Sequence, residues 1–185
     1  MKKLIYLFSM LVLLCACHHK QQPKNVEPID RVVVVDECIN ADNADMSAKY
    51  EKYTWYETQV VLNNYLDAEY AGVETVTNIF QVLEEDGDPL VIHYIHDKVG
   101  TTVNEVSGFW IEDFPLEVVD VTFEQSLAFI NEINLPKPHS KQVCLRKPIG
   151  PKECNAQWVY GNVHSTLFVD AVDGKISEIN PAFPK

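Results

Sequence analysis

The sequence predicts an α+β fold, with antiparallel sheets and one or two packed helices. Two observations lead to this fold class. Short runs rich in β-branched and aromatic residues are separated by turn sequences such as Asp-Gly and Val-Gly, which is typical of strands joined by hairpins. One later segment instead places apolar residues at helical spacing behind a threonine that can cap a helix.

The first thirty residues are expected to stand outside this fold. Lys2 and Lys3 precede an apolar run over residues 4–14. A helix rises about 1.5 Å per residue, so this run is too short to cross a hydrocarbon core of about 30 Å. It is typical of a signal peptide. The polar segment that follows, with two prolines before residue 31, is predicted to be a flexible tether over residues 17–30.

The end of the apolar run resembles the lipobox of bacterial lipoproteins. Leu14 stands three residues before Cys17, and the small Ala16 directly precedes it. The resemblance implies that residues 1–16 are removed as a lipoprotein signal peptide and that Cys17 is acylated, so that a lipid anchor holds the chain on a membrane. Cys15 is the alternative lipid site, but Leu14 is large for the position before a cleavage site.

The residues after Cys17 suggest a location, by the same resemblance. His18 stands where an aspartate would mark retention in the inner membrane of enteric bacteria. Residues 18–24 lack the acidic residues that follow the cysteine in surface-exported lipoproteins of Bacteroidetes. The resemblance therefore implies attachment to the outer membrane, facing the periplasm.

The charge of the chain limits its partners. Without Lys2 and Lys3, 13 basic residues face 27 acidic residues, a net charge of −14. This charge argues against nucleic acid and against electrostatic docking on anionic lipid. Membrane affinity would then come from the lipid.

Residues 31–120 are predicted to form an N-terminal unit. The four valines at positions 32–35 favour a buried strand over residues 31–36, and residues 40–47 have the composition of a loop. Residues 53–66 fit either a helical face or a strand, and we favour the helix. Strands are then expected over residues 73–83, 90–96 and 101–111, joined by turns at residues 85–89 and 98–100 as an antiparallel meander.

Residues 121–185 are predicted to form a second unit. Thr122 is placed to cap a helix, with an apolar stripe at Phe123, Leu127, Ile130 and Ile133. Strands are expected over residues 141–146, 157–162, 166–171 and 175–179, the last two joined by a turn at Asp173-Gly174. If residues 53–66 are helical, both halves consist of one helix and three or four strands, which suggests two tandem helix-plus-meander units.

The last hairpin, Phe-Val-Asp-Ala-Val-Asp-Gly-Lys-Ile over residues 168–176, resembles PepSY-like domains of secreted and envelope proteins. The resemblance covers residues 121–180, about one third of the chain. The sequence departs from the family pattern in its cysteine-bracketed Lys-Pro-Ile-Gly-Pro-Lys loop. The resemblance implies a binding or protease-inhibitory role without a cofactor.

Motifs that would indicate catalysis are absent. The sequence contains no Gly-x-Ser-x-Gly, no His-Glu-x-x-His and no phosphate-binding glycine loop. His93 and His96 are the best metal-like pair, but residues three apart on a strand point to opposite faces. We therefore predict no catalytic residue, no metal site and no cofactor.

Three cysteines and a basic segment are the remaining candidates. Cys144 and Cys154 bracket a short loop and are the favoured disulfide, with Cys38 and either of them as the alternative. The surrounding segment carries no acidic residue up to position 152. We predict that its basic residues contact an acidic partner or a peptide carboxylate, although a solvated hairpin tip would look the same. These residues are Lys141, Arg146, Lys147 and Lys152.

Taken together, these features favour a non-enzymatic envelope lipoprotein that binds a protein or peptide. Inhibition of a protease is one form that this binding could take. Two alternatives stay open. One is an envelope hydrolase whose site forms only in three dimensions, and the other is a structural or assembly component of the envelope.

Overall fold

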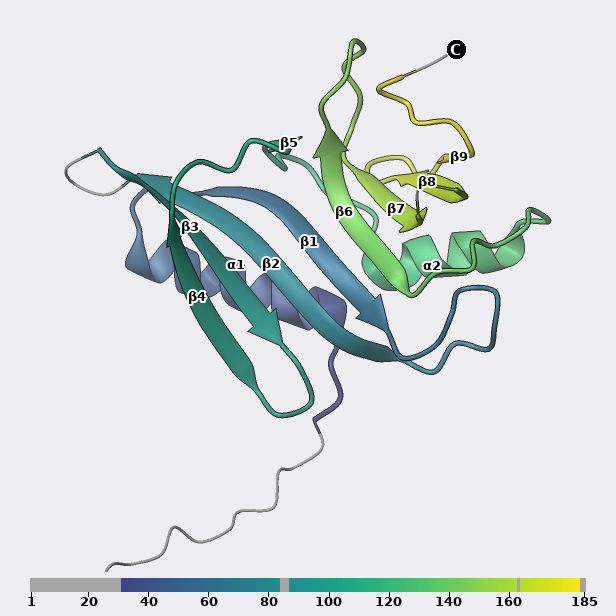
Figure 1. Cartoon of the computed structure of the whole chain (residues 1–185), viewed down its shortest axis with the longest axis horizontal. Helices are drawn as coiled ribbons and strands as arrows, with labels where there is room; N and C mark the ends of the chain where they lie inside the picture. Colours follow the sequence, from purple (N-terminus) through teal and green to yellow (C-terminus); the bar gives the residue numbers. More distant parts are fainter. Residues whose placement is uncertain (1–30, 84–86, 163, 184–185) are drawn as a thin grey trace, which may run out of the picture.

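The computed structural model describes residues 31–83, 87–162 and 164–183, and within them the fold is α+β, as the sequence predicts. Two helices pack on a nine-stranded antiparallel sheet (Figure 1). In chain order the elements are α1 (Val35–Lys49), β1 (Thr54–Leu62), β2 (Val73–Leu83), β3 (Pro89–His96), β4 (Thr101–Ser107), β5 (Asp113–Phe114), α2 (Phe123–Glu132), β6 (Gln142–Pro148), β7 (Gln157–Gly161), β8 (Thr166–Asp170) and β9 (Ile176–Ser177).

The order of the strands is symmetric about the middle of the sheet. It runs β4-β3-β2-β1-β6-β7-β8-β9, with the short β5 beside β6. Each half of the chain thus supplies one helix followed by four strands. The first strand of one half, β1, pairs antiparallel with the first strand of the other, β6. The two halves therefore share one continuous sheet (Figure 1).

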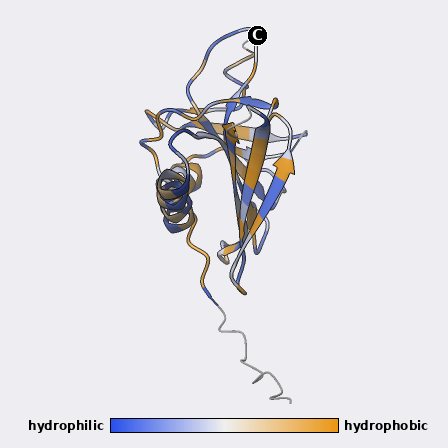
Figure 2. Ribbon diagram, turned by 90° about the vertical axis from the view of Figure 1, so that its left-hand side faces the viewer, coloured by the Kyte–Doolittle hydropathy of each residue, from blue (hydrophilic) through white to orange (hydrophobic). Residues whose placement is uncertain are grey.

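Both helices lie on the same face of the sheet. Figure 2 shows α1 nearly end-on, on one side of the strands. The main core fills the space between this face and the helices, and includes Val35 and Ile39 of α1, Phe123 and Ile130 of α2, and Trp158 of β7. We call this the helix-covered face, and the opposite side of the sheet the open face.

Helix α2 forms as the sequence predicts. The hydroxyl of Thr122 accepts from the backbone N–H of Gln125, and the side chain of Gln125 accepts from the N–H of Thr122, which completes a capping box. Phe123, Leu127 and Ile130 of the predicted stripe are buried. The helix ends one residue before Ile133.

Helix α1 contradicts two predictions. Residues 31–34 form no strand and residues 40–47 form no loop, because the helix begins at Val35 and continues to Lys49. Its buried residues Val35, Ile39, Asp42 and Met46 recur at helical spacing and pack on the sheet. Tertiary packing of this stripe outweighs the low helix propensity of the many Asn, Asp and Ser residues between them.

The helix predicted for residues 53–66 is also wrong. Most of these residues, Thr54–Leu62, form β1, which pairs with β2 on one side and β6 on the other. A central strand is partly covered on both faces, so its apolar residues do not alternate cleanly. A register shift between Trp55 and Glu57 disturbs the alternation further, and together these features imitate a helical pattern.

The remaining strands lie close to their predicted positions. β2 and β3 match, whereas β4 ends at Ser107 rather than at residue 111, and β9 is shorter than predicted. Gly174 has φ +73°, the left-handed backbone that the predicted Asp-Gly turn needs. Part of the predicted turn at residues 85–89 lies outside the described residues.

The predicted signal peptide, the predicted tether and Cys17 also lie outside the described residues. Among residues 31–83, 87–162 and 164–183, neither helix is long and apolar enough to cross a membrane.

Candidate functional site

The strand β4 is an unusually accessible edge of the sheet. All seven of its residues are exposed, and no described strand pairs with its outer side. Natural sheets usually protect such an edge with charged residues, above all lysine, or with proline, a bulge or a covering segment. β4 reads Thr-Thr-Val-Asn-Glu-Val-Ser, with Glu105 as its one charged residue, and its ladder with β3 runs without a register shift. The opposite edge, β9, has only two residues.

A hollow of about 520 Å³ borders β4 on the helix-covered face. It exists because α1 packs against β2, two strands inward, and leaves the helix side of β4 uncovered. Thr101 and Val103 lie opposite His96 and Tyr94 in the ladder, so all four side chains point to this face. The facing wall consists of α1 residues, namely Glu37, Cys38, Ala41, Asp42 and Asp45.

A chain of hydrogen bonds forms the inner side of this hollow and fixes α1 to the sheet. Thr58 of β1 donates to the Asn78 amide oxygen (2.6 Å), and the Asn78 amide nitrogen donates to Asp42 Oδ2 (2.6 Å). The same oxygen lies 2.7 Å from His96 Nε2. The other ring nitrogen of His96 lies 2.9 Å from the hydroxyl of Thr101, on β4. The network thus reaches from the centre of the sheet to its edge.

The position of His96 favours its charged form. Burial of the ring lowers its pKa, but the hydrogen bonds to Asp42 and Cys38 and the negative charge of Asp42 outweigh this effect and raise the pKa of His96 to about 9. The two ring nitrogens lie within hydrogen-bond distance of Asp42 and Thr101. Asp42 and charged His96 therefore form a positioned ion pair beneath α1.

Carboxylates dominate the rim of the hollow. Glu37, Asp45 and Asp97 line it, against one guanidinium, that of Arg31, among the lining residues. Asp45 also accepts from the hydroxyl of Tyr94 and pairs with Lys49 at 2.7 Å. The hollow therefore suits an apolar or basic side chain better than an acidic one.

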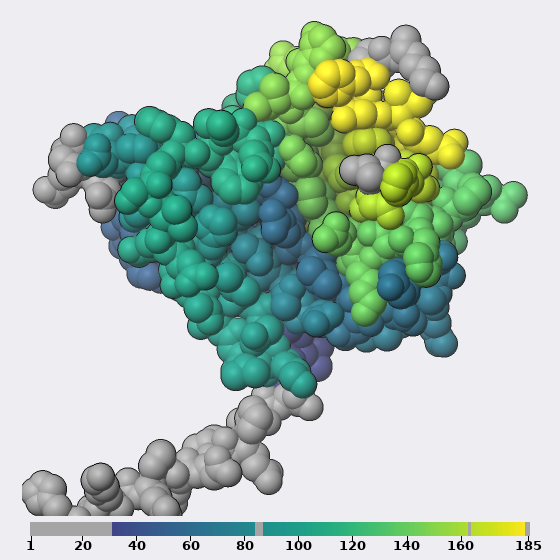
Figure 3. Space-filling model, in the orientation of Figure 1, coloured from purple at the N-terminus to yellow at the C-terminus, as the bar shows by residue number. Residues whose placement is uncertain are grey.

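A second polar cluster lies on the open face. Glu57 of β1 and Asp113 of β5 are both 4% exposed, and Arg146 of β6 donates to Asp113 Oδ1 at 2.6 Å. A hollow of about 380 Å³ lies beside them and is lined by β1, β6, β7 and β8. In Figure 3 the recessed blue surface of β1 lies between the teal surface of residues around 100–115 and the green surface of β6.

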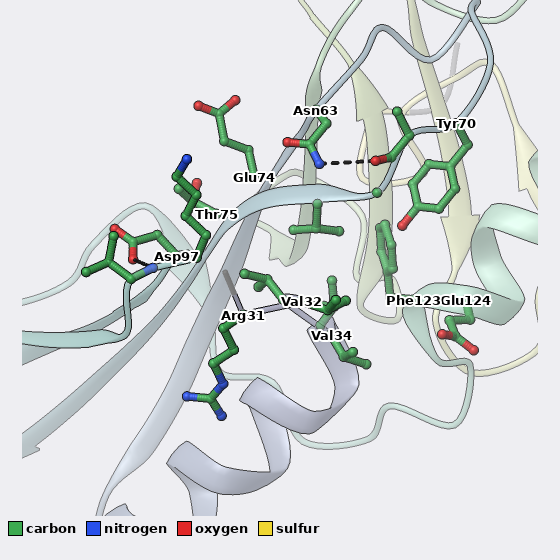
Figure 4. A pocket seen from close by; sticks show the side chains of 17 residues that line it. Arg31, Val32, Val34, Asn63, Tyr70, Glu74, Thr75, Asp97, Phe123 and Glu124 are labelled. Atoms are coloured by element: carbon green, nitrogen blue, oxygen red, sulfur yellow. Dashed lines mark hydrogen bonds between the residues drawn. The ribbon is translucent and has the colours of Figure 1, made fainter. Parts of the chain in front are cut away.

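A third hollow, of about 650 Å³, lies where the described chain begins. Figure 4 shows the rings of Tyr70 and Phe123 at one end, and Val32 and Val34 between these rings and Arg31. Val32 is 81% exposed. This hollow offers apolar surface with exposed charges at its margin, and we assign no ligand to it.

The basic residues predicted to contact a partner do not gather on one loop. Three of the four already have partners within the chain: Arg146 pairs with Asp113, Lys147 Nζ lies 3.9 Å from Glu117, and Lys141 donates to the carbonyl of Asn63. Lys152 lies on the projecting loop between β6 and β7 (Figure 1), where its N–H donates to the carbonyl of Ala182. The predicted contact through this loop stays a prediction and becomes weaker.

The three described cysteines carry free thiols in this structure. Cys144 lies within β6 opposite Gln59 and Val159, whereas Cys154 lies in the loop before β7. Burial raises the pKa of both the Cys144 and the Cys154 thiol, which keeps them protonated. A disulfide between them stays a prediction.

The two histidines of β3 point to opposite faces, as strand geometry predicts. His96 joins the network under α1, whereas the ring of His93 meets that of Trp110 at 6.1 Å on the open face. Within the described part of the chain, no three His, Cys, Asp or Glu side chains are grouped so that they could hold a metal ion.

Four buried polar residues of these clusters were not predicted from the sequence: Asp42, Asn78, Glu57 and Asp113. One signal could have found Asp42: the spacing of Val35, Ile39, Asp42 and Met46 predicts a helix that buries an acid on its apolar stripe. The remaining three lie in the strands β2, β1 and β5, and no local sequence pattern indicates which residues they meet.

Comparison with known proteins adds no relative: no family model, no curated protein and no solved structure matches this chain.

Proposed function

We propose that this protein is a non-enzymatic, lipid-anchored binding protein of the bacterial cell envelope, which holds an extended segment of a partner protein against β4. The observation that carries the proposal is the fully exposed seven-residue edge strand beside a hollow. A segment added to β4 would satisfy the outward backbone groups of the edge. Its alternate side chains would point toward α1 and enter the hollow of about 520 Å³.

The charge of the rim sets the expected partner. Because Glu37, Asp45 and Asp97 line the hollow, we expect the bound segment to carry apolar residues with a lysine or arginine directed toward α1. Affinity for such a segment should fall as salt screens these charges. The lipid on Cys17 would keep the groove close to the outer membrane, facing the periplasm.

A library of random extended peptides, screened against a soluble form beginning at Asn25, tests this proposal. The retained peptides should alternate β-branched with other residues and be enriched in basic residues. Val103→Lys places a charge at the edge and in the hollow, and should weaken their binding at least tenfold. Val99→Lys is the matched control, because Val99 is 70% exposed in the turn before β4, outside the strand.

Other results would redirect the proposal. Equal binding to Val103→Lys and Val99→Lys would contradict strand addition at β4. Loss of binding in a Lys147→Glu, Lys152→Glu double variant, with β4 intact, would show that the partner binds through the basic loop rather than through β4. Self-association that Val103→Lys abolishes would favour an assembly component paired through β4.

An envelope hydrolase has less support. The two acids that come together, Glu57 and Asp113, are the natural candidates for acid and base. However, their free oxygens are buried, so a substrate cannot reach them in this arrangement.

A further inference from the structure

The segment between β4 and α2 crosses the open face like a strap. We define this strap as residues 108–116. Its backbone is fixed at both ends, because the N–H of Trp110 donates to the side chain of Gln81 on β2 and the N–H of Leu116 donates to the carbonyl of Trp55. Between these points lies β5, which pairs with the end of β6 (Figure 1).

The middle of the strap brings a buried acid onto the sheet. The side chain of Asp113 is fully buried, and Arg146 donates through Nε to its Oδ1 and through Nη2 to the carbonyl of Glu112 at 3.2 Å. Glu57 lies directly opposite Arg146 in the β1–β6 ladder, and β1 contacts β5. Glu57 is close enough to Asp113 to raise the pKa of that carboxyl, by its charge and by hydrogen bonding. Gln59 donates to the other oxygen of Glu57, Oε1, at 3.2 Å.

One oxygen of each acid is left over. Among the described residues, Glu57 Oε2 and Asp113 Oδ2 are buried without a hydrogen-bond partner. Two ionised carboxylates beside one guanidinium would bury a net negative charge, which is costly away from water. A single proton between these two oxygens removes the excess charge and satisfies both oxygens.

We infer that Glu57 and Asp113 share one proton and that this proton latches the strap onto the open face. Loss of the proton leaves two carboxylates repelling each other across the contact between strap and sheet. The strap is therefore held in mildly acidic conditions and loosened as the pH rises. This inference does not rest on the proposed binding at β4.

The titratable groups around Glu57 and Asp113 support this direction of the pH dependence. Burial raises the pKa of Asp113, Arg146 opposes the shift, and the neighbouring Glu57 adds to it, so that the pKa reaches about 7. The Cys144 thiol of β6 is also near Glu57, and burial keeps it protonated. On β3, burial lowers the pKa of His93, so its ring is neutral when the shared proton of Glu57 and Asp113 is lost. Arg146 is thus the cation that faces the pair.

Hydrogen exchange of the mature chain tests the latch. In the wild type, protection of the strap amides, corrected for the intrinsic effect of pH, should fall about tenfold between pH 6 and pH 8, as the proton is lost. Glu57→Gln keeps a hydrogen-bond donor between the two side chains at every pH and should abolish this fall. Glu112→Gln, an exposed neighbour with the same change of charge, should behave as the wild type.

An identical fall in all three proteins, or no fall in the wild type, overturns the inference. A second measurement does not depend on a variant. Carbon NMR of the carboxyl groups should show the pair taking up one proton with a midpoint near neutral pH. Titration of both carboxyls below pH 5 also overturns the inference.

Discussion

Two polar clusters lie on opposite faces of β1 and begin at neighbouring residues. Thr58 points to the helix-covered face and starts the network through Asn78 and Asp42, in which the buried groups are bonded to one another. Glu57 points to the open face, where its Oε2 and one oxygen of Asp113 have no partner among the described residues.

The difference shows how the same chemistry serves two purposes. Under α1, one acid faces one histidine that can carry a charge, so the ion pair is balanced and fixes the helix to the sheet. On the open face, two acids face one arginine, so the charges balance only when a proton is bound. A balanced cluster stabilises one arrangement, whereas an unbalanced cluster responds to conditions.

The largest effect is expected from Asp42→Ala. This change leaves charged His96 and the amide of Asn78 buried without their acceptor, and breaking a buried pair in this way costs about 3–5 kcal/mol. Urea unfolding at pH 7 measures the loss. A change below about 1 kcal/mol would show that the network does not hold α1.

The second largest expected effect is a pH dependence of stability that distinguishes the two polar clusters. The pKa of His96 is raised to about 9 from 6.5, so its contribution to stability is fully present below about pH 6.5 and is lost as the pH rises through about 9. We expect about 1–3 kcal/mol of wild-type stability to disappear across this window. His96→Gln should flatten the profile between pH 6.5 and 9. An unchanged slope in this variant would contradict the assignment.

Glu57→Gln should change stability in the opposite direction to Asp42→Ala at high pH. The wild-type pair contributes most below about pH 4, the ordinary pKa of Asp113 being 3.8, and this contribution is lost as the pH rises through about 7. The amide removes the excess charge, so at pH 8 the variant should be more stable by the order of 1 kcal/mol. Urea unfolding at pH 5 and pH 8 measures this difference. A loss of unfolding free energy at pH 8 similar to that of Asp42→Ala would show that both clusters stabilise the fold in the same way and would contradict the comparison.

The smallest effect is expected from Asp45→Asn. Asp45 lies three residues after Asp42 on the same helix, but its side chain is partly exposed, and it pairs with the exposed Lys49. Exposed pairs contribute less than about 1 kcal/mol. The same urea experiment should therefore separate Asp45 clearly from Asp42. A loss as large as that of Asp42→Ala would mean that the charge of α1, rather than burial of the ion pair, determines stability.

The sequence by itself determined the elements whose signals are local. The α+β class, the cap and stripe of α2, the positions of β2 and β3, and the Asp-Gly turn at Gly174 follow from spacing and turn chemistry within a few residues. These local signals predict the structure correctly because each element shows a regular pattern of buried residues, or a residue such as glycine at a position whose backbone geometry requires it.

Only the tertiary structure decided the rest. α1 forms from a sequence with the composition of a loop because its few buried residues pack against the sheet. β1 is a strand because β2 and β6 pair with it on both sides. Asp42 meets His96 across 54 positions of sequence, and Arg146 meets Asp113 across 33. Such contacts depend on which strands become neighbours. That choice is set by burial over the whole sheet, so no local pattern in the chain records it.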